Sequence, residues 1–260
     1  MNENLRKSAS HPNSYSAAKK ILTVASGKGG VGKTWLSASL CHAMAQEGKR
    51  VLLFDGDLGL ANVDIQLGLN VQHDLVEVVS GKLSMRKAIT PYKAGGFYVI
   101  AGRSGSGVLA DLNRSRIKEM RREILSLANT FDRIVVDLGA GVETAVRGLL
   151  PKGCQTYVVT TDEPTSLTDA YAFVKIAMRI DPETDPKIIV NMADSLEKGL
   201  RTYETLARAC NSFLSRSPEL TGIVRRDSKV RDAIRRQTLY MTRYPTTTAS
   251  RDIRKIAAKL

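Results

Sequence analysis

The chain has 260 residues, of which 43% are hydrophobic, and carries a formal net charge of +13. This length and composition suit one large α/β domain with a sizeable core. Three scattered cysteines exclude a disulfide framework, and no apolar run reaches the ~20 residues that cross a bilayer. Because the polar start of the chain has no apolar signal core, we expect a cytoplasmic protein.

Residues 1–18 are polar and show no apolar period, so we expect a flexible tail there and one domain over residues 19–260. Within the domain, short apolar runs typical of buried strands alternate with stretches of helical period. The first predicted helix ends near Gly48, and a later one places Ile117, Met120, Ile124 and Leu127 on one face. Strands are predicted over residues 21–25, 51–54, 97–101, 134–136, 156–159 and 188–190.

The predicted strands are continuously apolar, and such strands need helices over both faces of their sheet. Strand and helix alternate along the chain, which predicts an α/β fold with a doubly wound, mostly parallel sheet. Ligands of such sheets bind at the carboxyl ends of the strands. The polar motifs of this sequence follow predicted strands, so we expect a single site at that edge.

The loop after the first strand matches the phosphate-binding pattern G-x-x-x-x-G-K-[ST] in full, with residues Gly27, Lys28, Gly29, Gly30, Val31, Gly32, Lys33 and Thr34. Its glycines let backbone N–H groups curl round phosphate oxygens, and the following helix adds a favourable dipole. We expect Lys33 to neutralise the β- and γ-phosphates and the Thr34 hydroxyl to bind Mg²⁺. The loop therefore predicts a P-loop ATPase with ATP and Mg²⁺ as cofactors.

Acidic residues follow two further strands. Asp55 and Asp57 come after the second strand, where two carboxylates can serve a metal ion and a water molecule, although Asp-Gly turn chemistry is an alternative. Asp137 ends the fourth strand, which is the Walker B arrangement that holds Mg²⁺ through bound water. The turn at residues 139–141 can bring backbone N–H groups near the γ-phosphate.

The segment Ser26–Thr34 resembles the deviant Walker A loop of the MinD/ParA family of ATPases. In that family the extra lysine reaches across an ATP-bound dimer to the partner's nucleotide. The resemblance therefore implies a homodimer in the ATP state, with Lys28 acting in trans. It also implies that Asp57 orients the attacking water and that Asp55 belongs to the magnesium shell. The predicted catalytic residues are then Lys28, Lys33 and Asp57, and the predicted magnesium ligands are Thr34, Asp55 and Asp137.

Two longer segments, residues 54–64 and 160–170, look like the FlhG/FleN branch, the MinD-like ATPases that regulate flagellar number and placement. The resemblance covers about residues 20–260 and implies slow hydrolysis without an activator, with a flagellar GTPase or regulator as the protein partner. Asn191, at the end of the sixth strand, resembles the family's adenine-contacting Asn. Asp227 lies in a segment similar to the family's Ile-Pro-x-Asp-x-x-Val stretch near the base, although the proline is absent.

The end of the chain is basic. Between Gly222 and Leu260, eleven basic residues and three acidic ones give a net charge of +8. Such a surface attracts anionic membrane or nonspecific DNA, or is an ordinary solvated face. ParA-like DNA partitioning and MinD-like division-site placement are therefore the alternative functions. A peripheral position at the membrane or cell pole is the alternative to a free cytoplasmic one.

Two apolar features favour packing. The segment 253–260 carries an apolar stripe with basic flanks, as a lipid-surface helix does, but it resembles the last helix of the family's core. We therefore expect this stripe to pack against the domain. Trp35 follows Thr34 where relatives usually carry a small or polar residue, and a packing role is expected for it as well.

Overall fold

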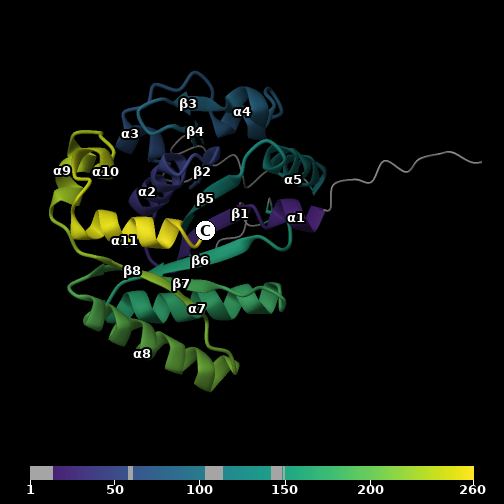
Figure 1. Ribbon diagram of the computed structural model, residues 1–260. Coiled ribbons are helices and arrows are strands. Elements are labelled where there is room, and N and C mark those ends of the chain that lie inside the picture. Colours follow the sequence, from purple (N-terminus) through teal and green to yellow (C-terminus); the bar gives the residue numbers. More distant parts are fainter. Residues whose placement is uncertain (1–13, 58–60, 103–113, 142–147, 149) are drawn as a thin grey trace, which may run out of the picture.

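The computed structural model describes residues 14–57, 61–102, 114–141, 148 and 150–260 (Figure 1). Its centre is an eight-stranded sheet in the order β3-β4-β2-β5-β1-β6-β7-β8. The pair of β3 and β4 is antiparallel, and the other neighbouring strands run parallel. The strands are β1 (Ile21–Ser26), β2 (Val51–Gly56), β3 (Thr90–Tyr92), β4 (Phe97–Ile100), β5 (Arg133–Ala140), β6 (Gln155–Thr160), β7 (Lys187–Ala193) and β8 (Leu220–Arg225).

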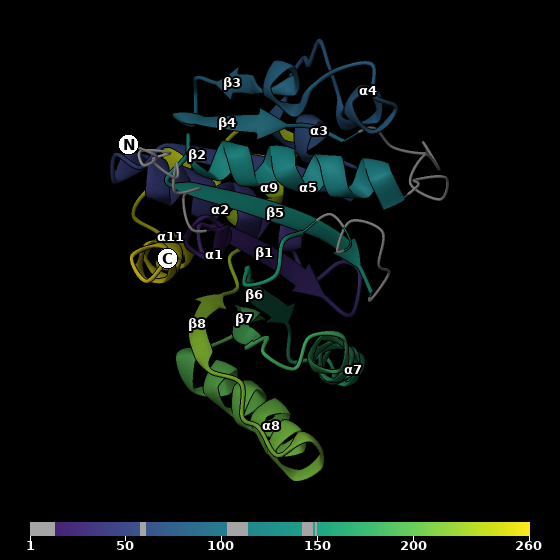
Figure 2. The same ribbon diagram turned by 90° about the vertical axis from the view of Figure 1, so that its right-hand side faces the viewer.

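Helices surround the sheet, and Figures 1 and 2 place α7 and α8 towards the β8 end and α4 with β3 and β4 at the opposite end. The α-helices are α1 (Ser14–Ala18), α2 (Lys33–Gln46), α3 (Val63–Leu67), α4 (Leu75–Val79), α5 (Arg114–Ala128), α7 (Pro164–Ile180), α8 (Leu196–Leu214), α9 (Lys229–Arg235), α10 (Tyr240–Arg243) and α11 (Thr248–Ala257), and η1 (Met85–Ala88) is a 3₁₀ helix.

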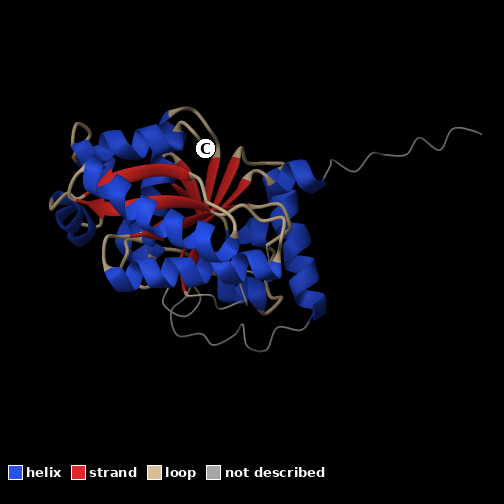
Figure 3. Ribbon diagram, turned by 90° about the horizontal axis from the view of Figure 1, so that it is seen from below, coloured by secondary structure: helices blue, strands red, loops and turns tan. Residues whose placement is uncertain are grey.

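The sheet is covered on both faces, as the sequence predicted. Ile21 and Ala25 of β1 belong to a core cluster with side chains of α5, α7 and α8. Leu22 and Val24 of the same strand belong to a second cluster with α2 and α11. Successive strand side chains point to opposite faces, so this division follows from the pleat. Figure 3 shows the strands lying between the helices, which confirms the doubly wound α/β fold.

The strand order decides which loops meet. β1 lies between β5 and β6, β2 lies beyond β5, and β7 lies beyond β6. Because these strands are parallel, their carboxyl ends share one edge of the sheet. The loop after β1 is therefore flanked by the acidic strand ends of β2 and β5 on one side and by the ends of β6 and β7 on the other.

Two strands were not predicted from the sequence. β3 has only three residues, including Pro91, and pairs at the edge of the sheet, where a missing N–H is tolerated. β8 contains Gly222, which interrupts the apolar run that signals a strand. This glycine is required by packing, because a Cβ atom there would lie 2.4 Å from the Cγ1 atom of Ile256.

The two ends of the described chain are both packed. Residues 14–18, predicted as part of the tail, form helix α1 instead, and Ala17 and Ala18 are buried because this helix packs near α5. The rest of the predicted tail, residues 1–13, lies outside the described residues. At the other end, the apolar stripe of residues 253–260 is buried against the sheet and α2, which confirms the expected core packing. No described helix has the length and apolarity needed to span a bilayer.

Candidate functional site

The loop from Gly27 to Thr34 joins β1 to α2, as predicted. Gly30 and Gly32 adopt the left-handed region with φ of 81° and 85°, and Gly32 is the N-cap of α2. Gly27 is required for a different reason, since a Cβ atom there would lie 2.1 Å from the carbonyl oxygen of Asp169 in α7. The N-terminus of α2 therefore opens directly from this loop, and its free N–H groups form an anion site.

Lys33 lies inside the loop with 8% of its surface exposed. Its Nζ atom donates to the Ser26 Oγ atom at 2.8 Å. Burial lowers the pKa of Lys33, and the negative charges of Asp137 and Asp57 oppose that shift. A cation held in this way meets bound phosphate groups with little competing solvent.

Two buried carboxylates lie beside this lysine. Asp55 and Asp137 occupy paired positions on the neighbouring strands β2 and β5. Asp137 accepts a hydrogen bond from the Ser37 hydroxyl at 3.1 Å and a further one from Thr34. Burial raises the pKa of Asp137 to about 6, although these donors and Lys33 act against the shift. Burial, together with the charge of Asp137, raises the pKa of Asp55 to about 7.

The oxygen atoms at this site are suitable ligands for Mg²⁺. Asp137, Asp55 and the Thr34 hydroxyl supply oxygen atoms, which are the ligands that Mg²⁺ prefers. The raised pKa values of the two carboxyl groups show that burial disfavours their charged forms, and a bound cation stabilises those charged forms. Within the described part of the chain, no cluster of three or more His, Cys, Asp or Glu side chains forms a complete metal cage. Mg²⁺ in nucleotide sites needs no such cage, because phosphates and water complete its shell.

Asp55 also organises its own loop. Its Oδ1 atom accepts from the backbone N–H of Asp57, and its Oδ2 atom accepts from that of Val63, both at 3.2 Å. The buried carboxylate thus ties the end of β2 to the start of α3. Sequence reasoning gave Asp55 only a place in the magnesium shell, because the sequence between Asp57 and Val63 carries no sign of this contact.

Asp57 lies against the end of β5. A Cβ atom on Gly139 would be 3.3 Å from the Oδ1 atom of Asp57. The acid is close enough to influence Lys33, Asp55 and Asp137 electrostatically. The structure therefore brings together the loop lysine and all three predicted acids at one edge of the sheet.

Lys28 points elsewhere. Its Nζ atom lies 2.7 Å from the Glu163 Oε2 atom and donates to the Thr165 hydroxyl at 2.8 Å. Its side chain is 37% exposed, whereas Lys33 is buried. The two lysines of the loop thus have separate surroundings, one inside the cradle and the other on the surface at the start of α7.

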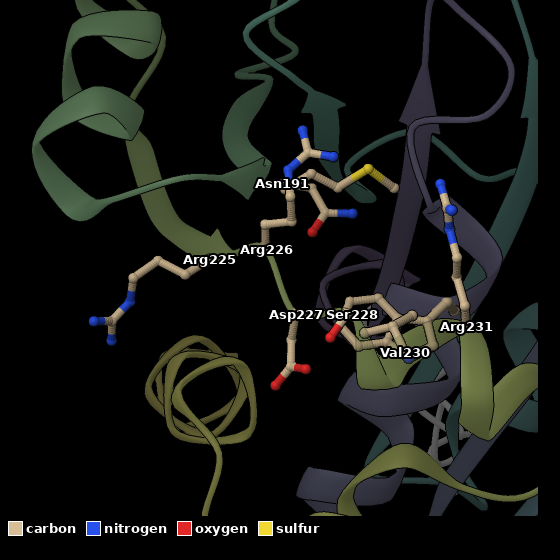
Figure 4. A pocket seen from close by; sticks show the side chains of 9 residues that line it. Asn191, Arg225, Arg226, Asp227, Ser228, Val230 and Arg231 are labelled. Atoms are coloured by element: carbon tan, nitrogen blue, oxygen red, sulfur yellow. The ribbon is translucent and has the colours of Figure 1, made fainter.

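A pocket of about 340 Å³ adjoins the loop on the side of β7 (Figure 4). The buried Asn191 side chain joins the two, because its Nδ2 atom donates to the Val31 carbonyl at 2.8 Å. The pocket is lined by Trp35, Asn191, Met192, Arg225, Arg226, Asp227, Ser228, Val230 and Arg231.

Asp227 lines this pocket, but its carboxylate is used within the chain. Oδ2 accepts from the Tyr240 hydroxyl at 2.6 Å, and Oδ1 accepts from the Lys229 N–H at 2.8 Å. In Figure 4 the carboxylate is directed away from Asn191. Asp227 therefore shapes the loop before α9, and its predicted contact with a nucleotide base stays a prediction.

Several pocket residues were missed by the sequence reasoning. Arg226 and Arg231 carried no signal beyond general basicity. Tyr240, which does not line the pocket but binds Asp227, was missed as well. Met192 has a φ of 58°, a left-handed value that is uncommon for a residue with a side chain. Only the departure of Trp35 from the usual small residue pointed to something unusual here.

Comparison with known proteins agrees with this geometry. The family model described as the CobQ/CobB/MinD/ParA nucleotide binding domain matches residues 22–240. The antiactivator FleN of Pseudomonas aeruginosa is 32% identical over 241 residues, which cover 93% of this chain and 86% of FleN. The flagellum site-determining protein YlxH of Helicobacter pylori is 30% identical over 242 residues, covering 93% of this chain and 81% of YlxH.

Solved structures show the same architecture. A chain of the MinC:MinD cell division protein complex of Aquifex aeolicus is similar with a TM-score of 0.75 and 26% identity, covering 92% of this chain and 95% of that one. A ParA family ATPase of Chlorobium tepidum gives a TM-score of 0.78, covering 94% and 100% of the two chains, and at 20% identity it supports the fold alone. The chain therefore belongs to the CobQ/CobB/MinD/ParA nucleotide-binding family and is a P-loop ATPase, whose predicted cofactors, ATP and Mg²⁺, are those of the family.

Proposed function

We propose that this protein is an ATP-dependent dimerising switch that regulates flagellar number or placement. The observation that carries the proposal is the position of Lys28, a residue of the phosphate loop whose ammonium group lies on the surface and not in the cradle with Lys33. A lysine placed in this way is available to the nucleotide of a second copy of the chain.

The reaction is the hydrolysis of ATP to ADP and phosphate. Lys33 neutralises charge on the β- and γ-phosphates, and Lys28 adds a cation from the partner subunit. Asp57 orients the attacking water. Thr34, Asp55 and Asp137 would hold Mg²⁺, which would offset charge on the phosphates. Catalysis in such a site is mainly positioning and charge neutralisation.

The contact between Lys28 and Glu163 gives the switch two states. In the single chain, the ammonium group is bound to Glu163, the N-cap of its own α7, and to Thr165 in the first turn of that helix. Closing of the ATP dimer moves it to the partner's nucleotide, and hydrolysis returns it. Lys28 is partly exposed and Glu163 is largely exposed, so the ion pair is screened by solvent and the exchange costs little free energy.

The biological role rests on relatives. FleN is named an antiactivator and YlxH a flagellum site-determining protein, and each aligns with 93% of this chain. We propose the same type of role here, exerted in the cytoplasm or at the periphery of the membrane or cell pole. The partner is a flagellar GTPase or regulator that recognises the ATP-bound dimer and accelerates slow hydrolysis.

The size of the protein in solution tests the switch. Light scattering is measured with Mg-ADP and with a nonhydrolysable ATP analogue, for the parental chain and for Lys28→Ala. We expect the parental chain to be a dimer with the analogue and a monomer with Mg-ADP. We expect the Lys28→Ala variant to bind the analogue but to stay monomeric. A parental chain that binds the analogue in a calorimeter yet remains monomeric at high concentration contradicts the proposal.

A DNA-partitioning role is the second candidate, favoured by the basic segment between Gly222 and Leu260. Several of its arginines are already paired: Arg225 with Asp252, and both Arg236 and Arg243 with Asp232. These pairs reduce the charge offered to a polyanion.

Division-site placement is the third candidate, and it predicts ATP-dependent pelleting with anionic liposomes. The buried stripe on α11 offers no apolar surface for lipid insertion.

A further inference from the structure

Trp35 is the only tryptophan of the chain and lies in the first turn of α2, directly after Thr34. It is 8% exposed and belongs to the core cluster between α2, α10 and α11. It also lines the pocket beside the loop. The residue therefore contributes to the core and to the wall of a cavity at the same time.

The helix geometry turns Trp35 away from the acidic side of the site. Thr34 and Ser37 donate hydrogen bonds to Asp137. Successive residues of a helix are about 100° apart, so Trp35 faces a different direction. Its ring packs edge-on against Tyr240, with ring centroids 5.3 Å apart and an angle of 74° between the planes.

The pocket begins where the phosphate loop ends. A Cβ atom on Gly32 would lie 2.6 Å from the Asn191 Nδ2 atom, so the pocket side chains touch the loop itself. A nucleotide whose terminal phosphates lie in the loop must extend its ribose and base away from Asp137. The pocket of about 340 Å³ lies on that side, and its size is in the range of small-molecule sites, roughly 300–1,000 Å³.

The indole ring is an unusual choice for packing alone. Its Nε1 atom is buried and has no hydrogen-bond partner among the described residues. A buried donor without a partner destabilises the folded state, and a phenyl ring would fill much of the same space without that cost. The aromatic face of tryptophan, in contrast, is a good contact for a planar base.

We propose that Trp35 forms a wall of the nucleoside pocket and contacts the ribose and base of the nucleotide. The inference rests on the proposed function, because it takes the loop as the phosphate site. Asn191 joins this wall to the loop, and Arg226 and Arg231 close the pocket on the side of β8 and α9. Trp35 is thus a binding residue that the family motifs do not contain.

Trp35 fluorescence tests the proposal in the parental chain, since no other tryptophan contributes. The probes are Mg-ADP, which has a base, and Mg-tripolyphosphate, which occupies the loop alone. Binding of each is measured separately by calorimetry. We expect a saturable change in Trp35 emission with Mg-ADP and little change with tripolyphosphate. Binding of Mg-ADP with unchanged emission, or equal emission changes with both probes, overturns the inference. If neither probe binds, the proposed function itself is wrong.

Variants supply the second measurement. Trp35→Ala is expected to weaken Mg-ADP binding by about tenfold, the size of one base–aromatic contact, and Trp35→Phe by less. Tripolyphosphate affinity stays unchanged in both. Trp35→Phe keeps the aromatic contact with Tyr240, so it remains informative if the alanine variant does not fold.

Tyr240→Phe is the matched control. It keeps the ring that Trp35 contacts but removes the hydroxyl that holds Asp227. This variant is expected to bind Mg-ADP more tightly than Trp35→Ala. If Tyr240→Phe loses as much affinity as Trp35→Ala, Trp35 acts through Tyr240 and Asp227, and the proposed direct contact is wrong.

Discussion

At the scale of single residues, we expect Lys33 to be needed for nucleotide binding and Asp57 for hydrolysis alone. Lys33→Ala removes the buried cation of the cradle and is expected to abolish Mg-ATP binding in a calorimeter. Asp57→Ala leaves the cradle intact, so it is expected to keep ATP binding, stop phosphate release and hold the protein in its dimeric state. Circular dichroism serves as the folding control. An Asp57→Ala chain that hydrolyses ATP at the parental rate shows that another group orients the water.

The buried acids make the nucleotide-free protein sensitive to pH. The pKa of Asp55 is about 7 in the folded chain, far above its ordinary value of 3.8. As the pH rises from about 6.5 to 8, the folded state must release a proton that the unfolded state has already lost. The contribution of Asp55 to the free energy of unfolding therefore falls by roughly 1 kcal/mol. His42 acts in the opposite direction, because its pKa is lowered to about 4 in the folded chain while the unfolded chain still holds part of this proton near pH 6.5, so its loss raises stability by a smaller amount.

Denaturant unfolding at several pH values measures this effect, with Asp55→Asn as the reference. The variant cannot ionise at position 55, so its stability is expected to change less between pH 6.5 and 8. A parental protein whose stability rises over this window, or whose slope equals that of Asp55→Asn, contradicts the assignment.

At the scale of elements, the start of α7 holds the surface lysine of the loop. Glu163→Gln weakens the contact with Lys28. Because Lys28 is then free to reach the partner subunit, the association constant of the dimer with a nonhydrolysable ATP analogue is expected to rise by roughly two- to fivefold. This is the size of the contribution of an exposed ion pair. Analytical ultracentrifugation measures the constant.

The matched control for this prediction is Glu197→Gln on α8, which removes the more exposed ion pair with Arg201 and makes the same change in charge. It is expected to leave dimerisation unchanged. Equal effects of the two substitutions indicate a general change in net charge, and no effect of Glu163→Gln means that this contact does not restrain Lys28.

The elements also show where sequence patterns succeed. α2 was predicted because a loop motif precedes it and its apolar residues recur at helical spacing. β8 was missed because Gly222 breaks the apolar run. A glycine is needed at this position because Ile256 of α11 packs directly against it. A contact between segments far apart in the chain leaves no local period to detect.

At the scale of the whole molecule, the net charge of +13 predicts some affinity for polyanions. If DNA partitioning is the function, the chain is retained on nonspecific DNA in an ATP-dependent way, and the retention falls steeply with salt. For the proposed flagellar role, we expect weak retention that does not depend on nucleotide. Binding to immobilised DNA at several salt concentrations, with ATP or ADP, measures the difference. Strong ATP-dependent retention would favour the partitioning role.

The sequence by itself determined the doubly wound fold, the phosphate loop and the strand-end acids, because each depends on a local pattern: apolar runs, glycine spacing, or an acid directly after a strand. Only the tertiary structure decided that Asp55 and Asp137 lie side by side, that Lys28 is bound to Glu163, that Asp227 turns towards Tyr240, and that Trp35 borders a pocket. These four facts depend on strand order and on packing between distant segments, which no local pattern encodes.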